Sequence, residues 1–389
     1  MRVLIVAEAD LRTSGSGAER VLGHHVAGLR ARGHDVIVLS GGGGSPRVEA
    51  GVRIVPLGWS LLTPWRARVA AASVFATGTI DAVIVHHALP ATALLDLAEG
   101  HHAPLLYVFH SPWSEEYDVR EPGRRGVAHA LGHAARRRIE RRVLAASARV
   151  FPLSRYMAER AIALHGLAAS VVRVVPGGID RERFRPPADR QAVRRRLGLP
   201  ERAPVILSLR NLEPRMGLSA LIDAMPTVLA TQPDAVLVVA GTGPLQRELA
   251  ARAVELRLGD HARFPGFIAE HDLADLYGAA DVFVLPSQAL EGFGLVTLEA
   301  LACGTPVLGS RVGATPELLE PLDRQLLLSD TSAASIAAAI TRFFARSDRG
   351  ELGARCRAHT ATYAWPDVMA RLEREIADVV AAPAMAERR

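Results

Sequence analysis

Short, continuous runs of apolar and β-branched residues recur along the whole chain and constrain its fold more than any other feature. The runs lack polar alternation, which indicates strands that are buried on both faces of a sheet. Helical segments such as 219–231 separate them, so the pattern predicts βαβ units with parallel strands. The runs lie at 2–7, 34–40, 52–57, 81–87, 104–110, 148–154, 171–177, 204–210, 235–241, 262–267, 281–287, 306–311 and 324–329.

One segment, residues 184–204, interrupts this series, because it is rich in proline and arginine and has no apolar periodicity. We interpret it as a linker between two doubly wound, Rossmann-like domains, 1–184 and 200–365. Such sheets bind ligands at the carboxyl ends of their strands, so a ligand cleft between the domains is expected. The last helical segment, within 366–389, is expected to pack back on the first domain.

The chain contains no lysine, so all of its 46 basic residues are arginines. A Schiff base to pyridoxal phosphate and a P-loop lysine are therefore excluded. Any phosphate that a side-chain cation holds must be held by arginine, whose planar guanidinium suits bidentate contacts. No cofactor of the pyridoxal phosphate type is expected.

The remaining composition is that of a globular protein and does not demand a nucleic-acid partner. A net charge of +5 is modest for this length, and no arginine block is interleaved with aromatic residues. Cys303 and Cys356 cannot form a disulfide framework or a cysteine zinc cluster. The pairs of adjacent histidines lack the spacing of a metal site, so we expect no metal. An early break at Glu8 argues against a signal peptide, and no run reaches about 18 apolar residues, so we expect a cytoplasmic protein.

The stretch LEGFGLVTLEALACGTPV, residues 290–307, combines a glycine loop with the start of a buried helix. Open backbone N–H groups and the helix dipole make such a start an anion site. Glu299 lies more than one turn inside the helix, where a carboxylate suits a ribose diol. Glu291 lies on the other side of the anion, so the two acids would bracket a diphosphate.

This stretch resembles the E-x7-E motif of retaining glycosyltransferases of family 4, a group with the GT-B fold that includes bacterial mannosyl- and glucosyltransferases. Other segments resemble the family in order and spacing across nearly the whole chain. VVPGGID resembles the family's Pro-Asn-Gly-Val-Asp, with Gly177 in place of the asparagine. The remaining matching segments are 16–40, LRNLEPRMGL at 209–218, VAGTGPLQREL at 239–249 and DVFVLPSQ at 281–288.

The resemblance implies roles for the residues of the motif. Glu291 would bind hydroxyls of the donor sugar, and Glu299 would hold the nucleotide ribose. Arg210 would contact the diphosphate. The backbone N–H groups near the sugar and phosphate would come from Gly292, Phe293, Gly294 and Leu295.

The resemblance also implies roles outside the motif. Where the family often has a lysine this chain has Met216, and the adjacent Arg215 is the candidate substitute. Gly17 would let the backbone approach the phosphates or the acceptor, and His110 would lie near the donor sugar. The donor base would contact the backbone near Phe267 and Ile268.

The expected function is transfer of a sugar from a nucleotide sugar to an acceptor hydroxyl with retention of configuration and without a metal. A sugar-nucleotide epimerase with the same architecture is the alternative. The acceptor can be a glycan, a lipid-linked sugar or a small molecule, and HSPWSEEYDVREPG at 110–123 is the candidate acceptor wall. The basic stretch 123–144 could touch an anionic membrane surface, although a helix with a solvated arginine face is the favoured interpretation.

Overall fold

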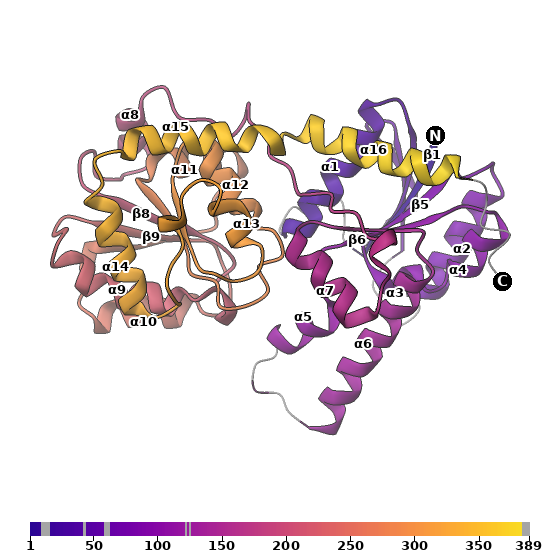
Figure 1. The fold of residues 1–389 in the computed structure, drawn as a ribbon, viewed down its shortest axis with the longest axis horizontal. Helices are drawn as coiled ribbons and strands as arrows, with labels where there is room; N and C mark the ends of the chain where they lie inside the picture. Colours follow the sequence, from indigo (N-terminus) through magenta and orange to yellow (C-terminus); the bar gives the residue numbers. More distant parts are fainter. Residues whose placement is uncertain (9–15, 42–43, 58–62, 121–122, 124–125, 383–389) are drawn as a thin grey trace. The chain divides into compact units, whose positions relative to one another are not determined.

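The computed structural model of the chain describes residues 1–8, 16–41, 44–57, 63–120, 123 and 126–382. It divides into two compact units: Met1–Gly177 with Trp365–Arg389, and Gly178–Ala364. Each unit is built on one sheet with helices packed against it (Figure 1).

The sheet of the first unit has the strand order β3-β4-β2-β1-β5-β6-β7, in which only the β3–β4 pairing is antiparallel. Its strands are β1 (Arg2–Val6), β2 (Asp35–Ser40), β3 (Arg47–Glu49), β4 (Val52–Pro56), β5 (Ala82–Val85), β6 (Leu105–Phe109) and β7 (Arg149–Pro152). Its helices are α1 (Gly17–Ala31), α2 (Thr63–Phe75), α3 (Ala88–Ala91), α4 (Leu95–Gly100), α5 (Trp113–Arg120), α6 (Val127–Ala145), α7 (Arg155–His165) and α16 (Trp365–Ala381), with a 3₁₀ turn η1 (Ala169–Val171).

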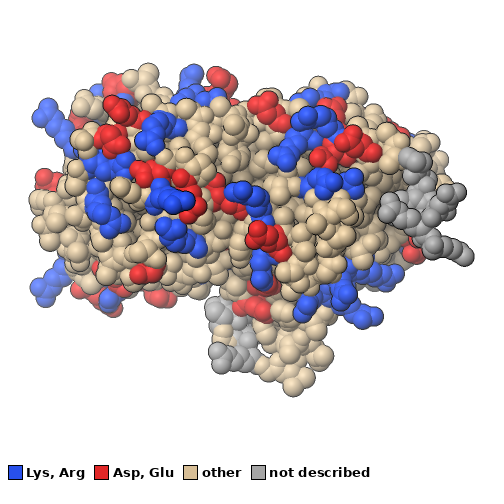
Figure 2. Space-filling view, in the orientation of Figure 1, with Lys and Arg blue, Asp and Glu red and all other residues tan. Residues whose placement is uncertain are grey.

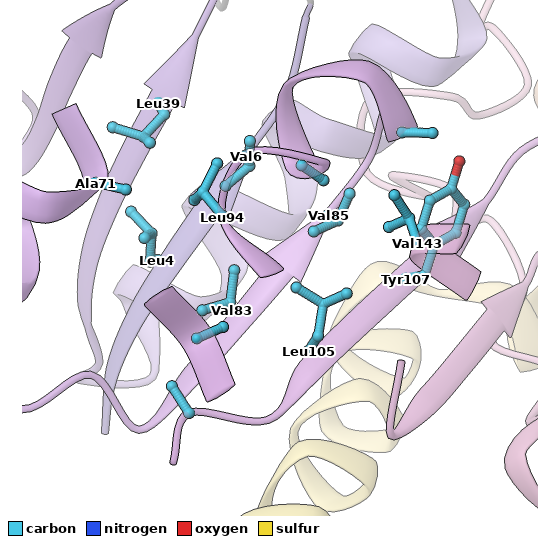
Figure 3. Close-up of a cluster of buried hydrophobic side chains, with 14 of the residues drawn as sticks. Leu4, Val6, Leu39, Ala71, Val83, Val85, Leu94, Leu105, Tyr107 and Val143 are labelled. Carbon is cyan, nitrogen blue, oxygen red and sulfur yellow. The ribbon is translucent and has the colours of Figure 1, made fainter. Parts of the chain in front are cut away.

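The central strands of this sheet are buried on both faces, as their continuous apolar sequence requires. In one face, Leu4 and Val6 of β1 lie beside Val83 and Val85 of β5 and near Leu105 of β6 (Figure 3). Full burial of an aliphatic side chain contributes roughly 1.5–3 kcal/mol, so these strands form the main source of stability of the unit.

Helix α16 packs on α1, although the two helices lie at opposite ends of the sequence. His24 stacks on Trp365 with ring centroids 4.2 Å apart, and His34 Nε2 lies 2.7 Å from Glu373 Oε1. A Cβ at Gly28 would lie 2.6 Å from Met369, so the glycine permits the close approach of the helices.

The second unit has the strand order β10-β9-β8-β11-β12, with all pairings parallel. Its strands are β8 (Val205–Leu209), β9 (Val236–Ala240), β10 (Ala262–Gly266), β11 (Val282–Leu285) and β12 (Val307–Gly309). Its helices are α8 (Arg190–Arg196), α9 (Leu218–Leu229), α10 (Gln246–Glu255), α11 (Leu273–Ala279), α12 (Leu295–Ala302), α13 (Thr315–Leu319), α14 (Ala333–Phe344) and α15 (Arg349–His359). The 3₁₀ turns are η2 (Pro214–Met216), η3 (Gly259–His261), η4 (Glu270–Asp272), η5 (Arg324–Leu326) and η6 (Thr360–Tyr363).

Both sheets have a point at which the strand order reverses. In the second unit the chain runs outward from β8 in one direction and from β11 in the other, and in the first unit β1 and β5 have this relation. Doubly wound sheets bind ligands outside the carboxyl ends of the strands at such switch points. Candidate site residues are therefore expected at the carboxyl ends of β8 and β11 in the second unit and of β1 and β5 in the first.

The segment 184–204, interpreted from the sequence as a linker, lies within the second unit and includes α8. Two of its arginines hold α8 on the rest of the second unit through ion pairs with Asp281. Arg194 is 3% exposed, binds Asp281 at 2.7 Å, and donates to the carbonyl of Ala279 at 2.8 Å. Arg190 binds the other oxygen of Asp281 at 2.9 Å. Apolar periodicity could not reveal this helix, because ionic contacts hold it.

Two expected strands are reduced to single bridges. Within residues 171–177, only Val172 pairs with the sheet, through an isolated β-bridge to Val150. Residues 324–329 begin with η5, where Asp323 caps the turn by accepting from the backbone N of Gln325, and then make one bridge between Gly309 and Leu327.

Basic and acidic side chains are interspersed over the face in Figure 2. Across the described ranges of the chain, none of the helices combines the length and the apolar character that crossing a bilayer requires.

The anchor at Asp281 yields a prediction about stability. Asp281→Asn keeps the shape of the side chain but leaves the Arg194 guanidinium buried without its counter-charge. Removing one partner of a buried pair typically costs about 3–5 kcal/mol, so we expect a loss near the lower end in urea unfolding. Asp234→Asn, on an exposed residue of the same unit, is the matched control and should change stability by less than about 0.5 kcal/mol. A loss below about 1 kcal/mol in Asp281→Asn would contradict the anchor.

Candidate active site

The carboxyl ends of β8 and β11 bring together Arg210, Ser287 and Glu291. Arg210 directly follows β8, and its Nη2 donates to Glu291 Oε2 at 2.7 Å. Ser287 follows β11 and donates from Oγ to the same carboxylate oxygen at 2.7 Å, while Arg210 Nη1 also contacts this hydroxyl. The three side chains form one hydrogen-bonded group across the β8/β11 switch point.

This group is buried and charged. Arg210 is 9% exposed and Glu291 is 7% exposed. Burial by itself would raise the pKa of Glu291, but the charge of Arg210, the hydrogen bonds from Ser287 and Arg210, and the charge of Arg215 together hold that pKa below its usual value. Glu291 is therefore an ionised carboxylate, oriented by donors on one side.

Two glycines let backbone segments approach this group closely. A Cβ at Gly241 would lie 1.9 Å from the carbonyl oxygen of Arg210, and a Cβ at Gly313 would lie 2.1 Å from that of Glu291. Both glycines have positive φ, +116° and +62°. Neither position can take a side chain without displacing a site residue.

Helix α12 begins at Leu295, four residues after Glu291, with Gly294 as its N-cap at φ +90°. A glycine has no side chain to cap the helix, so the first N–H groups point out of the helix start near Leu295. Thr297 Oγ1 is buried and has no hydrogen-bond partner among the described residues. Gly292 is partly exposed beside this helix start, whereas the ring of Phe293 is buried 6.0 Å from that of Tyr363. The geometry is that of an anion site at a helix N-terminus.

Glu299 lies inside α12 and is 4% exposed. Its Oε2 accepts a 2.8 Å hydrogen bond from the hydroxyl of Tyr277 in α11. Tyr277 is fully buried, so this bond fixes the carboxylate from the core side.

The other predicted residues of the second unit also lie at the carboxyl ends of its strands. Arg215, in η2, donates to the carbonyl oxygen of Leu290 at 3.1 Å and lies 3.5 Å from Glu213, while Met216 is buried. Phe267 and Ile268 follow β10, where Phe267 is 78% exposed. Residue 216 therefore supplies no cation, and the guanidinium of Arg215 is held beside the loop that carries Glu291.

Gly17 and His110 belong to the first unit. Gly17 is the first residue of α1, after the N-cap Ser16, whose hydroxyl accepts from Glu19 N at 3.2 Å. His110 follows β6, and its Nε2 lies 3.0 Å from His86 Nδ1. Burial, followed by the charges of His87 and His25, lowers the pKa of His110 to about 3, so its imidazole is neutral at physiological pH.

Glu8 and His87 were not predicted from the sequence, and they lie at the β1/β5 switch point. The backbone N of Glu8 donates to His87 Nδ1 at 3.0 Å. Burial raises the pKa of Glu8 to about 7, and its Oε1 has no hydrogen-bond partner within the described part of the chain. A single carboxylate after an apolar strand carries no motif, so only the place of Glu8 at the switch point could have indicated it.

The structure thus gathers the predicted residues of the second unit along one sheet edge and places Gly17 and His110 in the first unit. Ser287 and Tyr277, which position Glu291 and Glu299, were also missed. Within the described ranges, histidine, cysteine and acidic side chains form no group suited to a metal ion.

Comparisons with known proteins show which family the two units resemble. Residues 15–183 match the family model described as Glycosyltransferase Family 4, and residues 189–361 match that of Glycosyl transferases group 1. D-inositol 3-phosphate glycosyltransferase 1 of Catenulispora acidiphila is 33% identical over 307 residues, which cover 76% of this chain and 72% of that protein.

A second relative is the GDP-mannose-dependent alpha-(1-6)-phosphatidylinositol monomannoside mannosyltransferase of Mycobacterium tuberculosis. It is 34% identical over 229 residues, which cover 57% of this chain and only 59% of the relative's length. The solved structure of sucrose-phosphate synthase from Thermosynechococcus elongatus superposes with a TM-score of 0.84 at 24% identity, covering 98% of this chain and all of that one. This likeness confirms the predicted GT-B fold with its two Rossmann-like sheets.

The raised pKa of Glu8 yields a prediction about pH. Because this pKa lies near 7 in the folded chain and near 4.5 when unfolded, the folded chain retains a proton that the unfolded chain loses. Stability from this group is therefore present below pH 4.5 and lost as the pH rises to 7, by up to about 3 kcal/mol. Glu8→Gln should be more stable than wild type in urea unfolding at pH 8, with no gain at pH 4.

The matched control is Glu99→Gln, on an exposed carboxylate of α4, which should behave alike at both pH values. A Glu8→Gln variant that is no more stable than wild type at pH 8 would show that the Glu8 carboxyl ionises without a burial penalty.

Proposed function

Because the chain belongs to glycosyltransferase family 4, we propose that it transfers a hexose from a nucleoside diphosphate sugar to an acceptor hydroxyl, with retention of the anomeric configuration. The observation that carries the proposal is the Arg210–Ser287–Glu291 group at the β8/β11 switch point, directly before the uncapped start of α12. A fixed carboxylate, a guanidinium and a helix N-terminus together suit a ligand with sugar hydroxyls next to a diphosphate.

In this proposal the second unit binds the donor. The diphosphate lies on the N–H groups at the start of α12, assisted by Arg215. Glu299 accepts hydrogen bonds from the ribose hydroxyls, in the orientation that Tyr277 fixes. The base contacts the backbone at Phe267 and Ile268, where the exposed ring of Phe267 offers a stacking surface.

Glu291 and Arg210 bind different polar groups of the donor, the first the sugar hydroxyls and the second the phosphate next to the sugar. Glu291 accepts from hydroxyls of the sugar with the lone pairs that Ser287 and Arg210 leave. Arg210 uses one nitrogen for Glu291 and has further N–H groups for the phosphate next to the sugar. The ion pair thereby holds the sugar and the leaving phosphate in one geometry.

The reaction requires stabilisation of negative charge on the departing diphosphate. Front-face attack through an oxocarbenium-like transition state would give retention, with the leaving phosphate taking the acceptor proton. Arg210, Arg215 and the N–H groups of α12 would stabilise the phosphate electrostatically. Neutral His110 would act near the sugar as a hydrogen-bond partner rather than as a cation.

We propose that the reaction needs neither a metal nor pyridoxal phosphate. The positive charge that a metal would supply to the diphosphate comes from arginine and from the helix dipole. The chain contains no lysine for a Schiff base.

We assign acceptor binding to the first unit, with residues 110–123 as the candidate acceptor wall. The two relatives named above act on an inositol phosphate and a phosphatidylinositol mannoside. Val127 and Leu131 in the first part of α6 are 77% and 65% exposed, and the arginines of the same helix follow from Arg136 onward. This arrangement supports peripheral contact with an anionic membrane surface and a lipid-linked acceptor.

The proposal predicts the consequence of removing Arg210. Nucleoside diphosphate release from GDP-mannose, UDP-glucose and ADP-glucose is measured for the full chain with myo-inositol, methyl α-D-mannoside or water as the sugar acceptor, and the best donor is used for the variants. Arg210→Ala should lower turnover about 10²–10³-fold, as loss of one transition-state donor typically does. The matched control is Arg202→Ala, an exposed arginine before β8 at the opposite end of the strand, which should retain full turnover.

Circular dichroism of Arg210→Ala separates loss of catalysis from loss of fold. Turnover within about threefold of wild type in the folded variant would contradict the role of Arg210, since one lost donor is worth far more. Failure of the wild type to bind any of the three donors would contradict the transferase function.

A further inference from the structure

The first unit has its own switch point, and the groups gathered there have no part in donor binding. The carboxyl end of β1 leads to Glu8, and the carboxyl end of β5 leads to His86 and His87. The backbone N of His86 donates to the carbonyl oxygen of Val6 at 2.9 Å, which fixes the register of the two strands. Glu8 and His87 are both partly exposed at this edge, whereas His86 is buried.

The Glu8 carboxyl is unusual because one of its oxygens is buried without a donor. Oε1 has no hydrogen-bond partner among the described residues, although the residue as a whole remains partly exposed. Leaving a buried acceptor unsatisfied is unfavourable, and such groups in native structures call for an explanation. A ligand hydroxyl that packs against Glu8 at the carboxyl end of β1 would supply the missing donor.

His87 offers the complementary group. Burial, and then the charge of Arg120, lowers the pKa of His87 to about 4, so its imidazole is neutral. Nδ1 accepts from the backbone N of Glu8 at 3.0 Å, and the proton of the neutral ring is therefore on Nε2. The site presents one N–H donor, on His87, and one carboxyl acceptor, on the residue whose backbone N donates to the same ring.

A histidine network behind this pair holds it in place. His86 Nδ1 lies 3.0 Å from His110 Nε2, and the ring of His25 is 5.3 Å from that of His86. The His87 and His110 rings stack with centroids 6.3 Å apart. His87 thus belongs to a cluster of histidines and lies beside the one that the family resemblance assigns to the donor sugar.

We infer that Glu8 and His87 form a hydroxyl-binding pair that takes the ring hydroxyls of a polyol acceptor, a sugar or a cyclitol. A hydroxyl can donate to the Glu8 carboxyl while it accepts from His87 Nε2, and neighbouring hydroxyls of a ring can share the two groups. The inference rests on the proposed function, because the acceptor is the substrate that the first unit would bind. A phosphate is the wrong ligand for this pair, since the Glu8 carboxylate would repel it.

The burial of Glu8 supports this assignment. Its pKa near 7 shows that the ionised carboxyl lacks the solvation it would have in water, and a hydroxyl donor would restore part of that solvation. A site that reads hydroxyls with buried polar groups also discriminates strongly against analogues that lack them.

The test is binding of two polyol probes, myo-inositol and methyl α-D-mannoside, to the full chain. A thermal-shift screen first selects GDP, UDP or ADP as the nucleotide that stabilises the chain most. Saturation-transfer NMR then gives the probe Kd in the presence of that nucleotide. Glu8→Gln and His87→Phe should each weaken probe binding at least tenfold, with the nucleotide Kd within twofold of wild type, whereas Glu99→Gln should change neither.

The outcomes separate this inference from the proposed function. Equal probe binding in wild type and Glu8→Gln, or no probe binding by a wild type that binds nucleotide, overturns the hydroxyl-binding pair and leaves the transferase intact. If no nucleotide stabilises the wild type but the probes bind and Glu8→Gln weakens them, the pair stands and the transferase function fails.

Discussion

The ion pair between Arg210 and Glu291 is the interaction on which the carboxyl edge of the second unit depends. It joins the end of β8 to the loop after β11, the two strands between which the order of the sheet reverses. A buried pair of this kind is weak evidence for stability, since desolvation offsets much of the attraction. Its value here is geometric: it fixes a carboxylate and a guanidinium, with Ser287, next to the start of α12, and the glycines at 241 and 313 permit that approach.

Arginine serves two distinct purposes in a chain without lysine. Arg194 is sequestered by Asp281 and by backbone carbonyls, so it stabilises α8 and takes no part in ligand binding. Arg210 is equally buried but pairs with a group at the switch point. In the sequence, Arg194 is the first of three consecutive arginines, whereas Arg210 directly follows an apolar run, and only the family resemblance gave Arg210 a role. Only the identity and place of the acidic partner separates a structural arginine from a candidate catalytic one.

The same contrast explains what the sequence predicted and what it did not. Continuous apolar runs predicted the parallel strands because burial on both faces leaves a simple pattern, and the glycine loop before an apolar run identified the helix that contains Glu299. The segment 184–204 was misinterpreted because ionic contacts leave no periodicity. Three of the residues that the sequence did not predict, Tyr277, Glu8 and His87, contact partners more than 20 residues away in the chain. The fourth, Ser287, contacts Glu291 only four residues later, but a loop with no regular spacing joins them. The local sequence pattern therefore predicted the helices and strands, whereas the side-chain contacts between them are visible only in the folded structure.

The most direct test of the central claim is calorimetric titration of wild type and Glu291→Gln with a nucleoside diphosphate and with its sugar conjugate. If Glu291 binds the sugar while other groups bind the diphosphate, the variant should lose about tenfold or more in affinity for the conjugate, roughly 1.4 kcal/mol. Its affinity for the nucleoside diphosphate alone should stay within about threefold, roughly 0.6 kcal/mol. An equal loss for both ligands, or no loss for either, would contradict a carboxylate held by Arg210 and Ser287 for the donor sugar.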